Sequence, residues 1–355
     1  MVPTSEIIES SHLVFVKPSM PGIYRKGSPG RFYYVEKNGD RIKDEAHLAR
    51  IKALVLPPAW KDVWISLKKN GYLQATGIDL AGRTQYRYHP DWTSRRSDHK
   101  YFRLLEFGKA LPNARKHIAR DLRRKEFDER KVLAICTEVM QRTLIRIGNE
   151  HYKKTHGSYG LSTLKDQHFK EQGNKATLCF VGKKGVKQEV ELNRKHLIKL
   201  VKQCKDIPGQ DLFQFYTTGK AHKSIDSGML NNYIREITDC DFTAKDFRTW
   251  GGTLEALRQL ACFTEKYPEM SRKKVIVEVL DVVALKLGNT RAVCKSSYVY
   301  PVLLEQFEAD GLTKYLKKIN AKKVETAAAM EDDEKVLLQF LKDATKSKAK
   351  SKARR

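Results

Sequence analysis

The hydrophobic pattern of this 355-residue chain changes once, at the polar segment HPDWTSRRSDH of residues 89 to 99. Between residues 31 and 88, short apolar runs are separated by turn signals such as Asn38-Gly39 and Asn70-Gly71, which is the pattern of antiparallel strands. Beyond residue 99, apolar residues recur at steps of three and four, as they do in amphipathic helices. The change of period predicts an α+β protein in which an N-terminal antiparallel β-sheet domain precedes a mainly α-helical domain.

The same change predicts the domain boundaries. We expect a β-rich domain over residues 1–95, a mainly helical domain over residues 96–330, and a C-terminal helix with a disordered basic tail over residues 331–355. The β-rich part contains one short helix, from Asp44 to Leu56, which stops at Pro57-Pro58. The length is sufficient for two domains that each bury a core.

Three elements of the helical domain can be placed from their end signals. A helix over residues 243–261 begins with a capping-box pair, and a second helix over residues 271–287 ends at Gly288. A hairpin over residues 176–192 turns around Lys183 and gives this domain a small β-sheet.

The charge of the chain indicates its partner. Lysine and arginine number 68 against 42 acidic residues, a net charge of +26, which is typical of proteins that bind a polyanion. The tail from Thr345 to Arg355, TKSKAKSKARR, is predicted to be a disordered arm that adds affinity for nucleic acid. Because 41% of the residues are hydrophobic, the rest of the chain is expected to fold.

Several classes of protein are disfavoured by what the sequence lacks. The six cysteines lie at least 22 residues apart, which argues against a zinc site or a disulfide scaffold and for a reducing, intracellular compartment. The sequence has no signal peptide pattern and no stretch near the roughly 18 apolar residues of a membrane span, so we expect no membrane association. There is no P-loop motif, and all ten histidines lie at or before His222, so chemistry in the C-terminal third would run without ATP or a local histidine pair.

Four basic residues are candidates for binding or catalysis. Lys245 and Arg248 are predicted to lie opposite the apolar stripe of their helix, facing solvent or a ligand. Arg146 follows an apolar helix, and Gly148 beside it permits close approach of the backbone. Lys183, at the hairpin turn, can reach into a groove. Each of them, taken alone, is more often an ordinary solvated charge.

Tyr298 is a candidate because of its predicted register. A helical stripe through this region buries Tyr300 and turns Tyr298 away from the core, although Pro301 is able to interrupt such a helix. The stripe consists of Val293, Ser297, Tyr300, Leu304 and Phe307.

Read together, six segments resemble the type IB DNA topoisomerases, specifically the compact poxvirus and bacterial branch. Their order and separations match that family from about residue 20 to 315. The segments are GRTQYRYH (82–89), RIGNEHY (146–152), YGLSTLKDQH (159–168), FVGKKGV (180–186), AKDFRTWGG (244–252) and GNTRAVCKSSY (288–298).

The resemblance implies a reaction in which a tyrosine attacks a DNA phosphodiester, leaving a 3′-phosphotyrosyl link and a free 5′-hydroxyl. By position, Tyr298 is then the nucleophile, Arg146 and Arg248 bind the phosphate oxygens, and Lys183 protonates the leaving 5′-oxygen. Guanidinium groups suit the charge that develops on nonbridging oxygens, and a departing alkoxide needs a cationic proton donor.

One position departs from the family pattern. Where the poxvirus and eukaryotic enzymes carry a histidine nine residues before the tyrosine, this chain has Asn289, whose amide can donate a hydrogen bond to phosphate but carries no charge. The resemblance also implies secondary DNA contacts, which are Gln85, Tyr86 and Tyr88 in the N-terminal domain and Tyr152 and Lys245 near the cleaved strand.

The function implied is relaxation of supercoils by a monomer whose two domains close as a clamp around double-stranded DNA, with no cofactor and independently of ATP and metal. The compartment expected is intracellular, with the bacterial cytoplasm or nucleoid favoured over a nucleus. Two alternatives stay open. A tyrosine recombinase shares the chemistry, but its N-terminal domain is normally a helical bundle, unlike the strand pattern here. A noncatalytic basic DNA-binding protein would leave Tyr298 inert.

Overall fold

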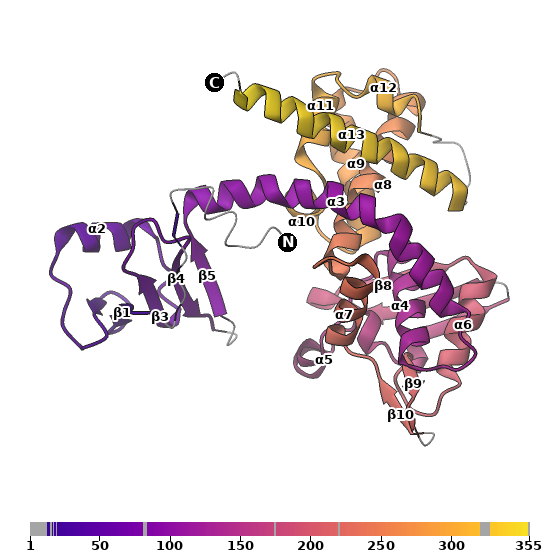
Figure 1. Cartoon of the computed structure of the whole chain (residues 1–355), viewed down its shortest axis with the longest axis horizontal. Helices are drawn as coiled ribbons and strands as arrows, with labels where there is room; N and C mark the ends of the chain where they lie inside the picture. Colours follow the sequence, from indigo (N-terminus) through magenta and orange to yellow (C-terminus); the bar gives the residue numbers. More distant parts are fainter. Residues whose placement is uncertain are drawn as a thin grey trace. The chain divides into compact units, whose positions relative to one another are not determined.

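The chain forms two compact units, Met1–Tyr101 and Phe102–Arg355, in a computed structural model (Figure 1). The structure describes residues 13–353 except 15, 17, 19, 81–83, 174, 219–220 and 320–326. The boundary lies inside helix α3 (Pro90–Leu122), whereas the sequence predicted it after residue 95 in a polar linker. Pro90 is the first residue of α3, a position where its missing N–H costs nothing, so the polar segment continues as helix.

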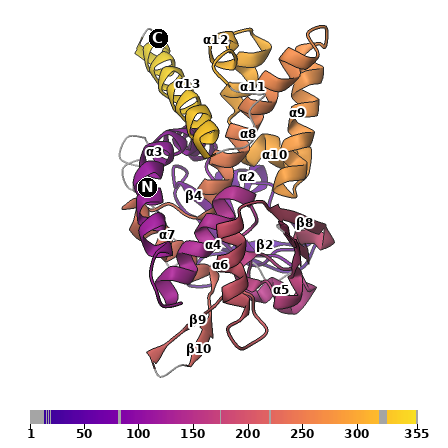
Figure 2. The ribbon, with the colours of Figure 1, turned by 90° about the vertical axis from the view of Figure 1, so that its right-hand side faces the viewer.

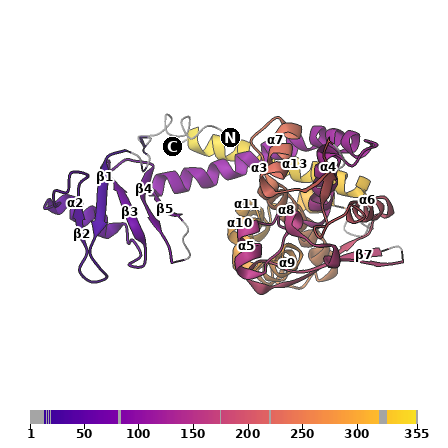
Figure 3. The same cartoon turned by 90° about the horizontal axis from the view of Figure 1, so that it is seen from below.

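The first unit is built on a five-stranded sheet in the order β2-β1-β3-β4-β5, in which every neighbouring pair is antiparallel (Figure 3). Helix α2 (Glu45–Ala53) begins after its N-cap Asp44 and buries Ile51 against the sheet residues Ile23 and Ile65. The predicted antiparallel sheet and its short helix are therefore confirmed. The strands are β1 (Gly22–Lys26), β2 (Tyr33–Val35), β3 (Lys61–Ser66), β4 (Leu73–Ile78) and β5 (Thr84–Tyr88).

The second unit is mainly helical, as predicted. Helix α8 lies at its centre and contacts α4, α7, α9, α12 and α13 (Figure 2). The helices after α3 are α4 (Glu129–Thr143), α5 (Glu150–His156), α6 (Lys195–Lys205), α7 (Ser227–Thr238), α8 (Ala244–Lys266), α9 (Arg272–Leu287), α10 (Arg291–Ser297), α11 (Pro301–Glu308), α12 (Thr313–Leu316) and α13 (Ala327–Ala353).

Two small sheets complete the second unit. Strands β6 (Phe169–Gln172), β7 (Lys175–Val181) and β8 (Lys187–Leu192) pair antiparallel in that order, which confirms the predicted hairpin. Strands β9 (Gln214–Tyr216) and β10 (His222–Ser224) form a second antiparallel pair. Among the described residues, no helix is long and apolar enough to cross a membrane.

Two sequence predictions about helices were wrong. The stripe from Val293 to Phe307 is not one helix: α10 ends at Ser297, and Pro301 begins α11, because a proline fits well in a first turn and disfavours a helix that continues through it. The tail from Thr345 is helical as far as Ala353 and extends α13. Lysine and alanine favour helix, and that segment contains no glycine or proline to stop it. Arg354 and Arg355 lie outside the described residues.

Candidate active site

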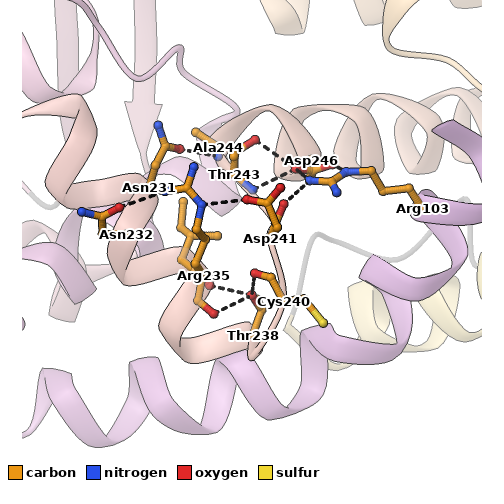
Figure 4. Close-up of polar contacts among 11 residues, drawn as sticks. Arg103, Asn231, Asn232, Arg235, Thr238, Cys240, Asp241, Thr243, Ala244 and Asp246 are labelled. Atoms are coloured by element: carbon orange, nitrogen blue, oxygen red, sulfur yellow. Dashed lines mark hydrogen bonds and ion pairs between the residues drawn. The ribbon is translucent and has the colours of Figure 1, made fainter. Parts of the chain in front are cut away.

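The N-terminus of α8 is fixed by a polar cluster at the turn between α7 and α8 (Figure 4). Asp246 accepts a hydrogen bond from Thr243 N (2.8 Å), which completes the predicted capping box. Arg103 of α3 donates to both carboxylate oxygens of Asp246 (2.7 and 2.9 Å) and to the carbonyl of Asp241. The first two turns of α8, which carry Lys245 and Arg248, are therefore held by the capping box and by Arg103.

Arg248 is buried inside the second unit, with 4% of its surface exposed. Its Nη1 donates to the carbonyl of Leu144 and its Nη2 to that of Leu287 (2.9 Å). Of the two predicted directions, toward solvent or toward a ligand, the first was wrong, because these two carbonyls hold the guanidinium inside the unit. Its Nε is buried and has no hydrogen-bond partner among the residues that the structure describes, and the two carbonyls occupy only two of the five N–H donors of the guanidinium. Lys245 is exposed, as predicted.

Tyr298 is held against α8 by its main chain. It follows the last residue of α10, and Thr253 Oγ1 lies 3.1 Å from its carbonyl oxygen while accepting a hydrogen bond from Tyr300 N (3.2 Å). A Cβ at Gly252 would lie 3.2 Å from the Tyr298 carbonyl oxygen, so glycine permits this close approach. The break between α10 and α11 thus fixes Tyr298 at the surface of α8, with Tyr300 buried as predicted.

Arg146 lies in the segment after α4, where Leu144 has a left-handed conformation (φ 57°) that turns the chain. Its Nη2 donates to Oδ1 of Asn289, which follows the end of α9. A Cβ at Gly160 would lie 2.6 Å from the Arg146 carbonyl oxygen and 2.5 Å from Gly148 N. Gly160 is therefore required for the segment that carries Arg146 to pack where it does.

Lys183 occupies the turn between β7 and β8, where it is exposed and lies with its Nζ 5.9 Å from the ring centre of Tyr152. The next residue, Lys184, has φ 65°, which gives the turn its shape. A narrow pocket is lined by Lys183 together with Arg146 and Arg248. Three of the predicted catalytic cations thus line one pocket.

The charges of this cluster act on the Tyr298 phenol. Burial alone would raise its pKa, but the positive charge and hydrogen bond of Arg248, then the charges of Arg146 and Lys245, outweigh burial, so the pKa lies below the ordinary value of 10. Burial also lowers the pKa of the Arg248 guanidinium, which an arginine tolerates without losing its charge. The arrangement favours the phenolate, the nucleophilic form of tyrosine.

The remaining predicted residues occupy two places. Asn289 lies beside the pocket, with its Oδ1 on Arg146 and its Nδ2 3.4 Å from the carbonyl of Leu287. Gln85, Tyr86 and Tyr88 are on the edge strand β5 of the first unit, where Tyr86 is 51% exposed and stacks on Tyr88 at 6.0 Å. Gln85 donates to Asp79 (2.8 Å).

Sequence reasoning missed the residues that hold the site together. Thr253 was not singled out, nor were Gly251 and Gly252, although two glycines in a row inside a helical pattern are a signal of close packing. A Cβ at Gly251 would lie 2.4 Å from a methyl carbon of Leu144. Among the described residues, no group of three or more histidine, cysteine, aspartate or glutamate side chains is placed to hold a metal.

Comparison with known proteins assigns the family. Residues 90–332 match the family model of the eukaryotic DNA topoisomerase I catalytic core, and residues 31–79 match that of the bacterial DNA topoisomerase IB N-terminal domain. The chain belongs to the type IB DNA topoisomerases. The resemblance inferred from the six segments, and with it the enzyme class, is confirmed.

This type IB topoisomerase is similar to viral relatives over most of its length. It is 32% identical to the DNA topoisomerase 1B of Acanthamoeba polyphaga mimivirus over 300 residues, which covers 82% of this chain and 89% of the relative. It is 25% identical to the DNA topoisomerase 1B of Vaccinia virus (strain Copenhagen) over 238 residues, 64% of this chain and 70% of the relative.

Proposed function

We propose that this type IB topoisomerase relaxes supercoiled duplex DNA by cutting one strand, holding it through a 3′-phosphotyrosyl bond, letting it rotate, and resealing it, without ATP or metal. The observation that carries the proposal is the contact between Tyr298 and the buried cation Arg248, which lowers the pKa of the phenol. Family membership supports DNA as the substrate and disfavours the tyrosine recombinase alternative.

In the cleavage step, the Tyr298 oxygen forms a bond to the scissile phosphorus while the bond from phosphorus to the 5′-oxygen breaks. The phenolic proton goes to solvent, and Lys183 supplies a proton to the departing 5′-oxygen. The exposed position of Lys183 on a tight turn suits this role, because a flexible ammonium can follow the leaving group. Resealing is the same sequence in reverse.

The two arginines stabilise the charge on the nonbridging oxygens in this proposal. Arg248 offers the guanidinium donors that the carbonyls of Leu144 and Leu287 do not occupy, and Arg146 offers those that Asn289 does not occupy. Asn289 holds Arg146 through its Oδ1, which leaves its Nδ2 as a neutral donor for phosphate. The asparagine thus donates to phosphate where the poxvirus and eukaryotic enzymes carry a histidine, but without a charge.

Duplex binding is assigned to residues around the pocket and on the first unit. We propose that Tyr152 and Lys245 contact the cleaved strand, that Gln85, Tyr86 and Tyr88 contact DNA from β5, and that one protein molecule encloses the duplex as a clamp. The net charge of +26 supports a strong electrostatic contribution to binding. We propose the bacterial cytoplasm or nucleoid as its compartment.

The test is relaxation of a negatively supercoiled plasmid in EDTA without nucleotide, with Tyr298→Phe as the control. Relaxation by the wild type and none by the variant supports the proposal. A recombinase would instead join defined sites in paired duplexes, and a noncatalytic DNA-binding protein would leave the plasmid topology unchanged after deproteinisation. Either of those results would contradict the proposed function.

A further inference from the structure

An ion pair between the buried Glu255 and the half-buried Lys286 joins α8 to α9 beside the pocket. Glu255 of α8 is 7% exposed, and its Oε2 lies 2.7 Å from Nζ of Lys286 in α9, while its Oε1 accepts a hydrogen bond from Gln259 (2.8 Å). Burial would raise the pKa of this carboxyl, but the charge and hydrogen bond of Lys286, together with the hydrogen bond of Gln259 and the charge of Arg258, outweigh burial, so the pKa lies below its ordinary value. Lys286 itself lines the pocket that contains Arg146 and Arg248.

The pair is located where α9 supplies two groups to the site. The carbonyl of Leu287, the residue after Lys286, accepts a hydrogen bond from Arg248 (2.9 Å). Asn289, two residues further on, accepts one from Arg146. Helix α9 ends between them at Gly288, which has φ 57°. A tether on Lys286 therefore fixes the last turn of α9 and, with it, one acceptor of each arginine: the Leu287 carbonyl for Arg248 and Asn289 Oδ1 for Arg146.

Helix α8 carries both Arg248 and the carboxylate of Glu255, which binds the end of α9. Arg248 and Glu255 are seven residues apart, which is about two helical turns, so they lie on the same face of α8. The face that carries the candidate catalytic arginine thus also carries the carboxylate that holds the end of α9. We propose that Glu255 and Lys286 are positioning residues, which set the orientation of Arg248 and, through Asn289, of Arg146; this inference rests on the proposed function.

Two other roles predict different measurements. If the ion pair contributes only to stability, its removal lowers Tm and the cleavage rate in parallel. If Lys286 instead contacts DNA phosphate directly, its removal weakens DNA binding and leaves the cleavage rate of the bound enzyme unchanged. The proposed role predicts that binding and folding persist while cleavage by the bound enzyme slows.

The experiment uses the double variant Glu255→Gln/Lys286→Met, because removing both charges together leaves no unpaired buried charge. Single-turnover cleavage of a nicked or suicide DNA substrate at saturating protein, Kd for DNA, and Tm are measured. We expect Kd within about twofold of wild type, a nearly unchanged Tm, and cleavage slowed roughly tenfold to a hundredfold, the range that small misplacements of catalytic groups produce. Lys286→Arg, which keeps the cation, should retain most of the rate.

A matched control is the exposed pair Asp281 and Arg291, which joins α9 to α10 away from the pocket lining. Asp281→Asn/Arg291→Met should cleave at the wild-type rate. In an Arg248→Ala background, adding the Glu255→Gln/Lys286→Met change should slow cleavage far less than it does in the wild type, because the group being oriented is absent.

The proposal is overturned if Glu255→Gln/Lys286→Met cleaves at the wild-type rate, if its slower cleavage is matched by a lost fold, or if only Kd changes. An undiminished effect in the Arg248→Ala background also overturns it. Failure of the proposed function is distinguishable, since it would appear as cleavage by Tyr298→Phe.

Discussion

The guanidinium carbon of Arg248 lies 5.0 Å from the centre of the Tyr298 ring. The cation is buried and bound to two main-chain carbonyls, so it cannot move away from the ring without losing those bonds. A fixed positive charge beside a phenol stabilises the phenolate before any substrate arrives. This relationship links the fold of the second unit to the reactivity of Tyr298.

The first prediction concerns pH. Arg248 lowers the pKa of Tyr298 against the opposing effect of burial, so removing the cation should raise that pKa from its value in the wild type. The rise of cleavage rate with pH should therefore lie at higher pH in Arg248→Ala than in the wild type. Single-turnover cleavage between pH 6 and about 10.5 measures this shift, the upper bound lying near the phenol's ordinary pKa. Parallel profiles that differ only in height would show that Arg248 does not act on the phenol.

The second prediction separates proton donation by Lys183 from binding. Lys183→Ala should slow cleavage by about a hundredfold or more, within the range of general acid catalysis, and should hardly change Kd. Replacing the bridging 5′-oxygen by sulfur removes the need for a proton, so this substrate should restore much of the rate to Lys183→Ala and less to Arg248→Ala. Equal rescue of both variants would transfer the acid role to another cation, with Lys245 the next candidate.

The third prediction tests how Tyr298 is held. Thr253→Val keeps the shape of the side chain but removes the hydroxyl that bridges Tyr298 and Tyr300. We expect a loss of about 1 to 3 kcal/mol in the free energy of unfolding, since Tyr300 N is buried and loses its partner. Cleavage should also slow, and Thr253→Ser should recover both. Urea unfolding and single-turnover cleavage provide the two readouts, and a Thr253→Val variant with wild-type values in both would contradict the account.

The fourth prediction concerns α13. Deletion of residues 346–355 removes six basic residues, so log Kd should depend less steeply on log salt, while cleavage at saturating protein should not change. Glu334→Gln is the contrasting variant, because Glu334 accepts bonds from Arg115 (2.6 and 2.8 Å) and Trp250 (3.1 Å). It should lower the free energy of unfolding by about 2 to 3 kcal/mol, since Arg115 is partly solvated. Loss of cleavage on deleting the tail would show that the tail takes part in the reaction.

The sequence predicted the features that depend on neighbouring residues, and it missed those that depend on residues distant in the chain. Local chemistry was sufficient for the Asn-Gly turns of the first unit, the capping box at Thr243 and the end of α9 at Gly288. The burial of Arg248 was not predictable from its helix, because it depends on neighbours that are distant in sequence, such as Leu144 and Leu287. Thr253 was missed for the same reason: its hydroxyl matters only because the break before Pro301 brings Tyr298 to it.

The most direct test of the central claim is the identity of the residue that becomes attached to DNA. A suicide substrate that traps the cleaved strand, followed by denaturation and peptide mass spectrometry, locates the covalent bond. The account predicts a 3′-phosphate on the peptide containing Tyr298, and no adduct with Tyr298→Phe although that variant binds DNA with a Kd within about twofold of wild type. An adduct on another residue, or one that persists in Tyr298→Phe, would contradict it.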